Sequence, residues 1–168
     1  MEVEKTKIGE FVSYDDLQKM KYLDQVVSEV LRKWPPAPAI ERMAVRDYRL
    51  DTDGIALHVE KGRNFMIPIY AIHHDPKHFP NPQRFDPERF DPTNKENNMN
   101  AFMAFGIGPR NCIASRFALM EVKTVLYYII LNFQFKVCAK TQIPLKYQKG
   151  MDSAVMEKGT WLELKALK

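Results

Sequence analysis

Residues 102–123 read FMAFGIGPRNCIASRFALMEVK, and a single cysteine, Cys112, lies in the middle of the stretch. Gly106 and Gly108 precede the cysteine and are typical of a loop. The residues after it, from about Ser115, have the pattern of a long helix. A thiol between a glycine-rich loop and a helix start lies near free backbone N–H groups, which favour a thiolate. The stretch therefore indicates a special role for Cys112, although a lone cysteine more often packs as a small apolar residue.

The neighbours of Cys112 bear on the choice among a metal site, a nucleophile and plain packing. Arg110 adds a cation two residues away, and Phe105 offers an aromatic face. A zinc site would need further cysteines or histidines at short spacing, and none is near. One thiolate, one arginine for an anionic group and an aromatic wall favour haem. Cys138, in the run FKVCAK, has no such neighbours, and we expect it to pack as an apolar residue.

Composition restricts the class of protein. The 168 residues are 45% hydrophobic and 27% charged, which is typical of one folded globular domain. The net charge of +4 is scattered along the chain, which argues against a nucleic-acid surface. Two distant cysteines indicate no disulfide and a reducing compartment. The first residues lack a signal core, and the longest apolar run, VLYYIIL at 125–131, is too short to cross a bilayer.

Periodicity predicts three helices. Apolar residues from Leu23 to Trp34 recur at helical spacing, and Pro35 with Pro36 ends that helix. A shorter helix is expected over residues 14–20, started by Ser13. The third runs from about Ser115 to Leu131.

The remaining segments read as short strands and a long loop. Between about residues 45 and 72, runs such as IALHVE and FMIPIY are separated by Asp-Gly and Lys-Gly turns, which predicts small hairpins. Residues 75–100 form a long irregular connection, rich in proline and asparagine. Three runs after the last helix are expected as strands of a small sheet: FQFKV, IPLKY and TWLELKAL.

Residues Phe105–Ile113, FGIGPRNCI, resemble the cysteine-ligand loop F-x-x-G-x-R-x-C-x-G of the cytochrome P-450 haem-thiolate monooxygenases. Two further motifs of that family occur in the same order, E-x-x-R at Glu29–Arg32 and P-E-R-F at Pro87–Phe90. The resemblance covers nearly the whole chain and is closest to the animal, insect-like detoxification branch. Ala114 departs from the pattern, because the family usually has glycine there, and we expect the small side chain to be tolerated.

The resemblance implies an α+β fold that is the C-terminal part of the mainly α cytochrome P-450 fold. Residues 1–168 would be a single partial domain, the C-terminal third of such an enzyme. The oxygen-activating helix, with its acidic residue next to threonine, would precede residue 1, as would the membrane anchor. We therefore expect this chain alone to be inactive.

The resemblance also implies the roles of individual residues. Cys112 would be the axial iron ligand and the catalytic residue, and Arg42 and Arg110 would each bind a haem propionate through the arginine fork. The residues expected to bind haem b (iron protoporphyrin IX) are Arg42, Phe105, Gly106, Arg110, Cys112, Ile113, Ala114 and Ala118. The residues expected to line the substrate pocket are Ala39, Ile40, Met151 and Asp152.

Glu29 and Arg32 allow two interpretations. On the helical wheel they lie opposite the apolar stripe, which predicts a solvated surface pair of little energetic value. The resemblance instead implies a buried triad in which Arg89 joins them and holds the long connection in place. The adjacent histidines His73 and His74 do not share a face, so we expect no metal role for them.

The activity that the resemblance implies is insertion of one oxygen atom from dioxygen into a small apolar substrate, with electrons from NADPH. The partners would be the flavoprotein NADPH–cytochrome P-450 reductase and, as a second candidate, cytochrome b5. Arg116 and Lys123 are candidates for reductase docking or for a solvated helix face. The full-length protein would lie on the cytoplasmic face of the endoplasmic reticulum membrane. Two alternatives stay open: a haem-binding fragment without catalysis, and a non-catalytic protein that interacts with the reductase.

Overall fold

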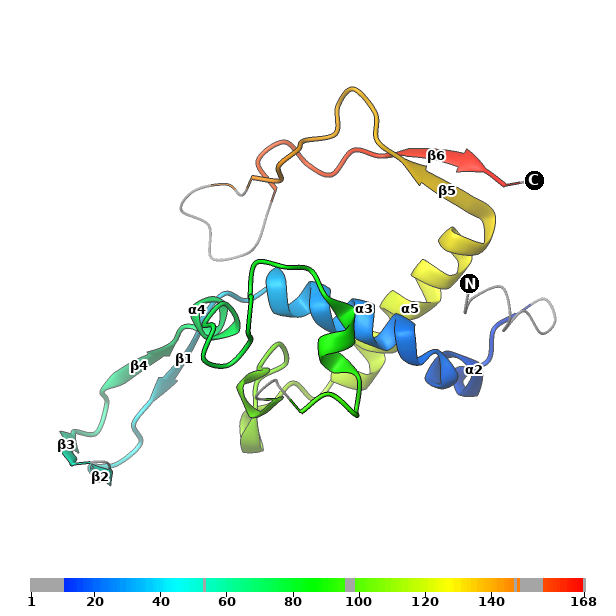
Figure 1. Cartoon of the computed structure of the whole chain (residues 1–168). Helices are drawn as coiled ribbons and strands as arrows, with labels where there is room; N and C mark the ends of the chain where they lie inside the picture. Colours follow the sequence, from blue (N-terminus) through cyan, green and yellow to red (C-terminus); the bar gives the residue numbers. More distant parts are fainter. Residues whose placement is uncertain (1–10, 53, 96–98, 147, 149–155, 168) are drawn as a thin grey trace.

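The computed structural model describes residues 11–52, 54–95, 99–146, 148 and 156–167. Its helices are α2 (Tyr14–Lys19), α3 (Lys21–Lys33), α4 (Ile69–His73) and α5 (Ser115–Asn132), with 3-10 turns η1 (Pro87–Phe90), η2 (Met99–Ala101) and η3 (Gly108–Arg110). Its strands are β1 (Ile40–Met43), β2 (Tyr48–Thr52), β3 (Ile55–Val59), β4 (Asn64–Ile67), β5 (Phe133–Lys136) and β6 (Glu163–Ala166). The fold is α+β, as expected, and α3 and α5 cross at its centre (Figure 1).

The helices begin and end where local chemistry requires. Ser13 caps α2, because its Oγ accepts a hydrogen bond from the backbone N–H of Asp16 at 3.2 Å. Helix α3 ends at Lys33, since Pro35 and Pro36 cannot continue the helical hydrogen bonds. The three helices predicted from periodicity are confirmed as α2, α3 and α5.

An apolar cluster joins these three helices. Its buried members are Leu17 of α2, Met20 at the C-cap of α2, Leu23 of α3 and Tyr127 of α5. Apolar side chains that are partly buried around the cluster include Met120 and Leu126. Burial of this apolar surface helps to hold α5 against α2 and α3.

Strands β1 to β4 form two antiparallel pairs that project from the helices as an arm (Figure 1). Strand β1 pairs with β4, with Arg42 opposite Phe65, and β2 pairs with β3. The prediction of small hairpins is confirmed, but the run FMIPIY is not one strand. It ends at Ile67, because Pro68 lacks the N–H that a strand ladder needs, and α4 begins directly after it.

The chain after α5 departs from expectation at one run. Strand β5 pairs with β6, with Phe133 opposite Ala166. The prediction of a strand at IPLKY is wrong for its described residues 143–146, which belong to no strand; the Lys146 carbonyl accepts one hydrogen bond, from Glu157 N–H at 2.8 Å. Among the described residues, no helix is both long and apolar enough to span a bilayer.

Candidate functional site

The loop before α5 is folded back on itself beneath Cys112. The backbone N–H of Cys112 donates to the carbonyl of Phe105 at 2.8 Å, and the N–H of Asn111 donates to the carbonyl of Gly108 at 3.1 Å. The Cys112 side chain is exposed, as are Arg110 and the fully solvent-facing Ile113. Backbone bonds therefore position the thiol, and no described part of the protein covers it.

Two glycines make this loop possible. Gly106 has φ +73° and Gly108 has φ +74°, in the left-handed region that side chains with a Cβ rarely adopt. A Cβ on Gly106 would lie 3.6 Å from Asn111 Cα, an ordinary contact, and one on Gly108 would meet open space. The glycines are thus required by the backbone conformation, and among the described residues nothing lies within 4 Å of a Cβ placed on Gly108.

Helix α5 begins where the sequence predicts, three residues after Cys112. The N-cap of α5 is Ala114, which makes no side-chain capping bond, and the first helical residue is Ser115. The Cys112 carbonyl accepts a hydrogen bond from Ser115 N–H at 3.4 Å. Cys112 therefore lies in the turn just before α5 and is not the N-cap residue of that helix.

An apolar groove of about 450 Å³ lies between α3, α5 and the loop. Its lining residues are Val26, Val27, Val30, Leu31, Pro36, Phe105, Ala118, Leu119, Val122 and Leu126. None of them carries a polar side chain, and the volume is in the usual range for a ligand pocket. Phe105 belongs to both the groove and the loop that holds Cys112, so the groove adjoins the cysteine loop.

Glu29 and Arg32 form a fully buried ion pair inside the protein. The Arg32 guanidinium donates from Nε and Nη2 to the two carboxylate oxygens of Glu29, at 2.7 and 2.9 Å. Arg89 of η1 is buried beside them, with its Nε 3.5 Å from Glu29 Oε1. The helical-wheel prediction of a solvated pair is wrong, because the long connection covers this face of α3.

Arg32 also binds the chain that covers it. Its Nη1 donates to the His73 carbonyl at 2.8 Å, and its Nη2 donates to the Pro82 carbonyl at 2.9 Å. Glu29 accepts a further bond from the Asp86 N–H at 2.9 Å. Each charge is thus compensated by several partners, which buried ions require.

His73 is a buried residue whose part in the site was not predicted. Its ring is completely inaccessible, and burial lowers the pKa of His73 from 6.5 to about 4, with a smaller contribution from the nearby Arg32 cation. The ring is therefore neutral at physiological pH. Only its adjacency to His74 was visible in the sequence, and that feature carried no information about burial.

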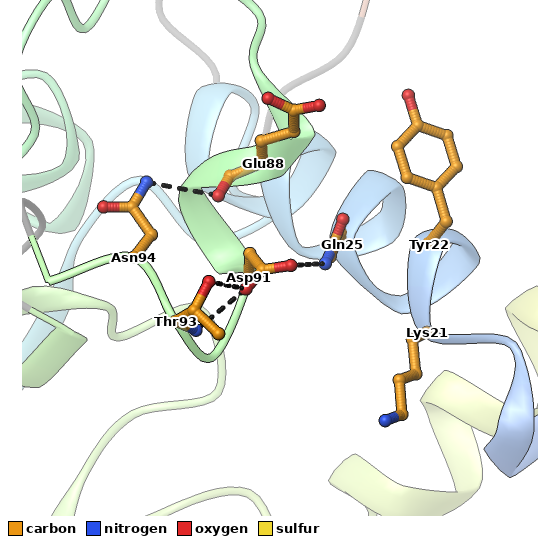
Figure 2. Close-up of a pocket in the computed structure, with 7 residues that line it drawn as sticks. All are labelled: Lys21, Tyr22, Gln25, Glu88, Asp91, Thr93 and Asn94. Carbon is orange, nitrogen blue, oxygen red and sulfur yellow. Dashed lines mark hydrogen bonds between the residues drawn. The ribbon is translucent and has the colours of Figure 1, made fainter.

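A polar hollow of about 560 Å³ lies where α3 meets η1, on the side of α3 away from the apolar groove (Figure 2). Its lining residues are Lys21, Tyr22, Gln25, Glu88, Asp91, Thr93 and Asn94. Asp91 accepts hydrogen bonds from the hydroxyl and the N–H of Thr93, which lower the pKa of Asp91, and from Gln25 Nε2 at 3.4 Å. Of these bonds, the one from Gln25 joins the connection to α3, next to the turn that carries Arg89.

The other residues expected in the site are spread over the chain. Arg42 lies in β1, half-buried, with its Nη1 donating to the Glu41 carbonyl at 2.8 Å. Ile40 is the first residue of the same strand and Ala39 directly precedes it, and both are half-buried. Met151 and Asp152 are outside the described residues. The structure thus brings together Phe105, Ala118 and the cysteine loop, while Arg42 belongs to the strand arm.

Lys123 is not a docking residue. Its side chain is buried, and its Nζ lies 2.7 Å from Asp24 Oδ1 and 3.1 Å from the Leu17 carbonyl. The two candidate roles of Lys123, reductase docking or a place on a solvated helix face, are therefore both wrong. Arg116, in the first turn of α5, is exposed. Cys138 lies beyond the end of β5, half-buried, where a hydrogen bond from the Thr141 hydroxyl lowers the pKa of its thiol.

Comparison with known proteins identifies the family. The model of the cytochrome P450 family matches residues 2–163. The chain is 48% identical over 154 residues to cytochrome P450 9e2 of Blattella germanica, covering 91% of this chain and 29% of that protein. It is 44% identical over 157 residues to the probable cytochrome P450 9f2 of Drosophila melanogaster (93% and 30%), and 47% identical over 141 residues to cytochrome P450 3A6 of Oryctolagus cuniculus (83% and 27%). The chain spans less than a third of the length of each of these relatives, and it belongs to the cytochrome P450 family.

Proposed function

We propose that Cys112 is the axial thiolate ligand of haem b and that the protein is a haem-thiolate monooxygenase of small apolar substrates. The observation that carries the proposal is the exposed thiol of Cys112, held by a backbone bond to Phe105, whose ring lines a groove without polar side chains. When bound through a thiolate, haem supplies oxygen activation, because the sulfur donates electron density that favours O–O cleavage.

The residues present fit such a group. A porphyrin has a broad apolar body, and a groove of about 450 Å³ lined only by apolar residues suits one. Phe105 and Ala118, which line that groove, would contact the ring. Gly106 has no side chain, so the backbone of the loop could come close to the ring there. Ile113 and Ala114 would contact the ring from the end of the loop, just before α5.

The charged residues would act at the edge of the ring. Arg110 and Arg42 would each bind a propionate, since a guanidinium can give a carboxylate two parallel hydrogen bonds. Arg110 is exposed beside the cysteine, so it is accessible to an anionic group. The buried Glu29, Arg32 and Arg89 would not touch the haem; they would hold the connection that leads into the cysteine loop.

The rest of the machinery is proposed for a protein in which residues 1–168 form the C-terminal third. Electrons would come from NADPH through a flavoprotein reductase, with cytochrome b5 as a second donor, and the exposed Arg116 is a candidate contact. The full-length protein would act at the cytoplasmic face of the endoplasmic reticulum membrane. Ala39, Ile40, Met151 and Asp152 would contribute to substrate selection, with xenobiotic compounds as the substrate class.

The test is spectroscopic and then catalytic. The protein is loaded with haem, reduced and treated with carbon monoxide, and we expect the red-shifted absorbance band that a thiolate-ligated haem gives. A band at the position of haem without a thiolate would overturn the proposal. Oxidation of a panel of apolar compounds by the full-length protein is then followed with reductase and NADPH; a red-shifted band without product from the full-length protein would favour a haem-binding protein that is not catalytic.

A further inference from the structure

His73 connects the buried ion pair to the segment that leads into the cysteine loop. Its Nε2 lies 2.9 Å from the backbone nitrogen of Met103, and its Nδ1 lies 3.1 Å from the carbonyl oxygen of Arg32. A backbone N–H can only donate and a carbonyl can only accept. One protonation state satisfies both contacts: a neutral ring with its proton on Nδ1, donating to Arg32, and a bare Nε2 that accepts from Met103.

The ring is held in this orientation from several sides. Arg32 returns the contact, because its Nη1 donates to the His73 carbonyl at 2.8 Å, so the two residues bind each other twice. The ring of Phe102 stacks on the imidazole, with centroids 5.4 Å apart and planes 19° apart. Phe79 meets it edge-on at 5.9 Å. An imidazole fixed in this way has little freedom to rotate and lose either hydrogen bond.

The contact with Met103 is transmitted toward Cys112 by the backbone. The Met103 carbonyl accepts a hydrogen bond from Gly106 N–H at 2.9 Å, which closes the turn before the first glycine. The Phe105 carbonyl, two residues further along the chain, accepts a hydrogen bond from Cys112 N–H at 2.8 Å. Met103 is also the last buried residue before the cysteine, since residues 104–112 are half-buried or exposed. His73 therefore binds the last buried residue of the segment that leads into Cys112.

We propose that His73 is a positioning residue for the thiolate loop: its bare Nε2 fixes the backbone at Met103 and thereby the place of Cys112 Sγ. The inference rests on the proposed function, because it concerns the cysteine as an iron ligand. It assigns to the histidine a role at a distance, through Met103, Gly106 and Phe105, without contact with the bound group.

Two substitutions separate the two ring nitrogens. In His73→Gln the amide oxygen reaches about as far as Nε2 and can accept from Met103, while the Nδ1 position is lost. In His73→Asn the amide reaches only about as far as Nδ1, so the bond to Arg32 is kept and Met103 N–H is left buried without an acceptor. Both variants remove the stacking of the imidazole on Phe102 and should lower the melting temperature alike.

The readout is the red-shifted carbon monoxide band of the haem-loaded protein, compared with the melting temperature of each variant. We expect His73→Gln to retain most of the band. We expect His73→Asn to reduce the thiolate-ligated share roughly tenfold, because a buried donor that loses its acceptor favours rearrangement of the loop. A purely structural role would instead make both bands follow the melting temperature.

The outcomes are distinguishable from failure of the proposed function. If the unsubstituted protein lacks the red-shifted band, the haem-thiolate proposal fails. If that protein has the band and His73→Asn keeps it as fully as His73→Gln, or both lose it equally, the inference about His73 is wrong. If neither variant folds, hydrogen exchange of the unsubstituted protein decides: the Met103 amide should exchange as slowly as amides within α3, and rapid exchange there overturns the inference.

Discussion

Lys123 of α5 and Asp24 of α3 form an ion pair across the two central helices, with Nζ 2.7 Å from Oδ1. The lysine is buried and its ammonium also donates to the Leu17 carbonyl at 3.1 Å, while Asp24 remains partly exposed. One side chain of α5 thus binds both α2 and α3. This contact lies beside the apolar cluster around Tyr127 and fixes the rotation of α5, from which Ala118 and Val122 enter the groove.

Replacing Lys123 with methionine should lower the free energy of unfolding by about 1–3 kcal/mol, because a buried ammonium loses its hydrogen bond to the Leu17 carbonyl and its ion pair with Asp24. Urea unfolding measures the change. Lys19→Met is the matched control: that lysine is 72% exposed in its pair with Asp16, so its loss should cost less than about 1 kcal/mol. Equal losses in the two variants would contradict the assigned role of the buried contact.

Cys112→Ser should abolish the red-shifted carbon monoxide band of the haem-loaded protein, because the hydroxyl is a poor substitute for a thiolate on iron. The side chain is exposed, and the bond that holds the loop at Cys112 comes from its backbone N–H, so we expect the free energy of unfolding without haem to change by less than about 0.5 kcal/mol. Cys138→Ser, which changes a half-buried thiol bonded to the Thr141 hydroxyl, should leave the band intact. Loss of the band in the Cys138 variant would show that the ligand is assigned to the wrong cysteine.

Arg89→Ala should destabilise the protein by about 3–5 kcal/mol, since it removes a buried cation 3.5 Å from Glu29 and a hydrogen bond to the Asn81 carbonyl. We expect the amount of bound haem to fall as the protein becomes less stable, and the substrate preference to stay unchanged. Arg84→Ala is the control, because that side chain is 73% exposed and lies 3.7 Å from Asp86. An Arg89 variant with the melting temperature and haem content of the unsubstituted protein would rule this out.

The stability of the protein should fall as the pH drops from about 6.5 toward 4, owing to His73. The folded state holds the pKa of His73 at about 4, so between these values the unfolded chain binds the proton and the folded protein does not. The contribution of His73 to the free energy of unfolding is complete above pH 6.5. About 1–3 kcal/mol of this free energy is lost by pH 4, after allowance for solvent screening. The charged or titratable groups acting on the ring are Arg32 and His74, with the carbonyl of Arg32 opposing them.

Urea unfolding at several pH values checks this expectation. The difference in unfolding free energy between the unsubstituted protein and His73→Gln should shrink through that window, because glutamine does not titrate while His74 and Arg32 are common to both. A difference that stays constant from pH 7 to pH 4 would contradict the assignment.

Several features could be read directly from short segments, because the forces that produce them are local. Pro35 and Pro36 end α3 wherever the helix packs, and Ser13 caps α2 through a hydrogen bond three residues away. Gly106 and Gly108 adopt the positive φ that their missing Cβ permits, so the loop before Cys112 was predictable as a loop. The match of that loop, E-x-x-R and P-E-R-F to one family depends on residue order alone. It predicted an α+β fold, and the family comparison bears that out.

The burial of charged and titratable residues could not be read in that way. A helical wheel shows that Glu29 and Arg32 lie on the face opposite Val26, but it does not show which face the chain will cover. The covering segment comes from more than 40 residues away and supplies carbonyls at His73 and Pro82 for the arginine. The sequence likewise does not show that Lys123 is buried, because its partners are Asp24 of α3 and the Leu17 carbonyl of α2, both about 100 residues away in the chain. Which ions become buried depends on partners distant in the chain, because a charge loses its hydration only where other groups replace it.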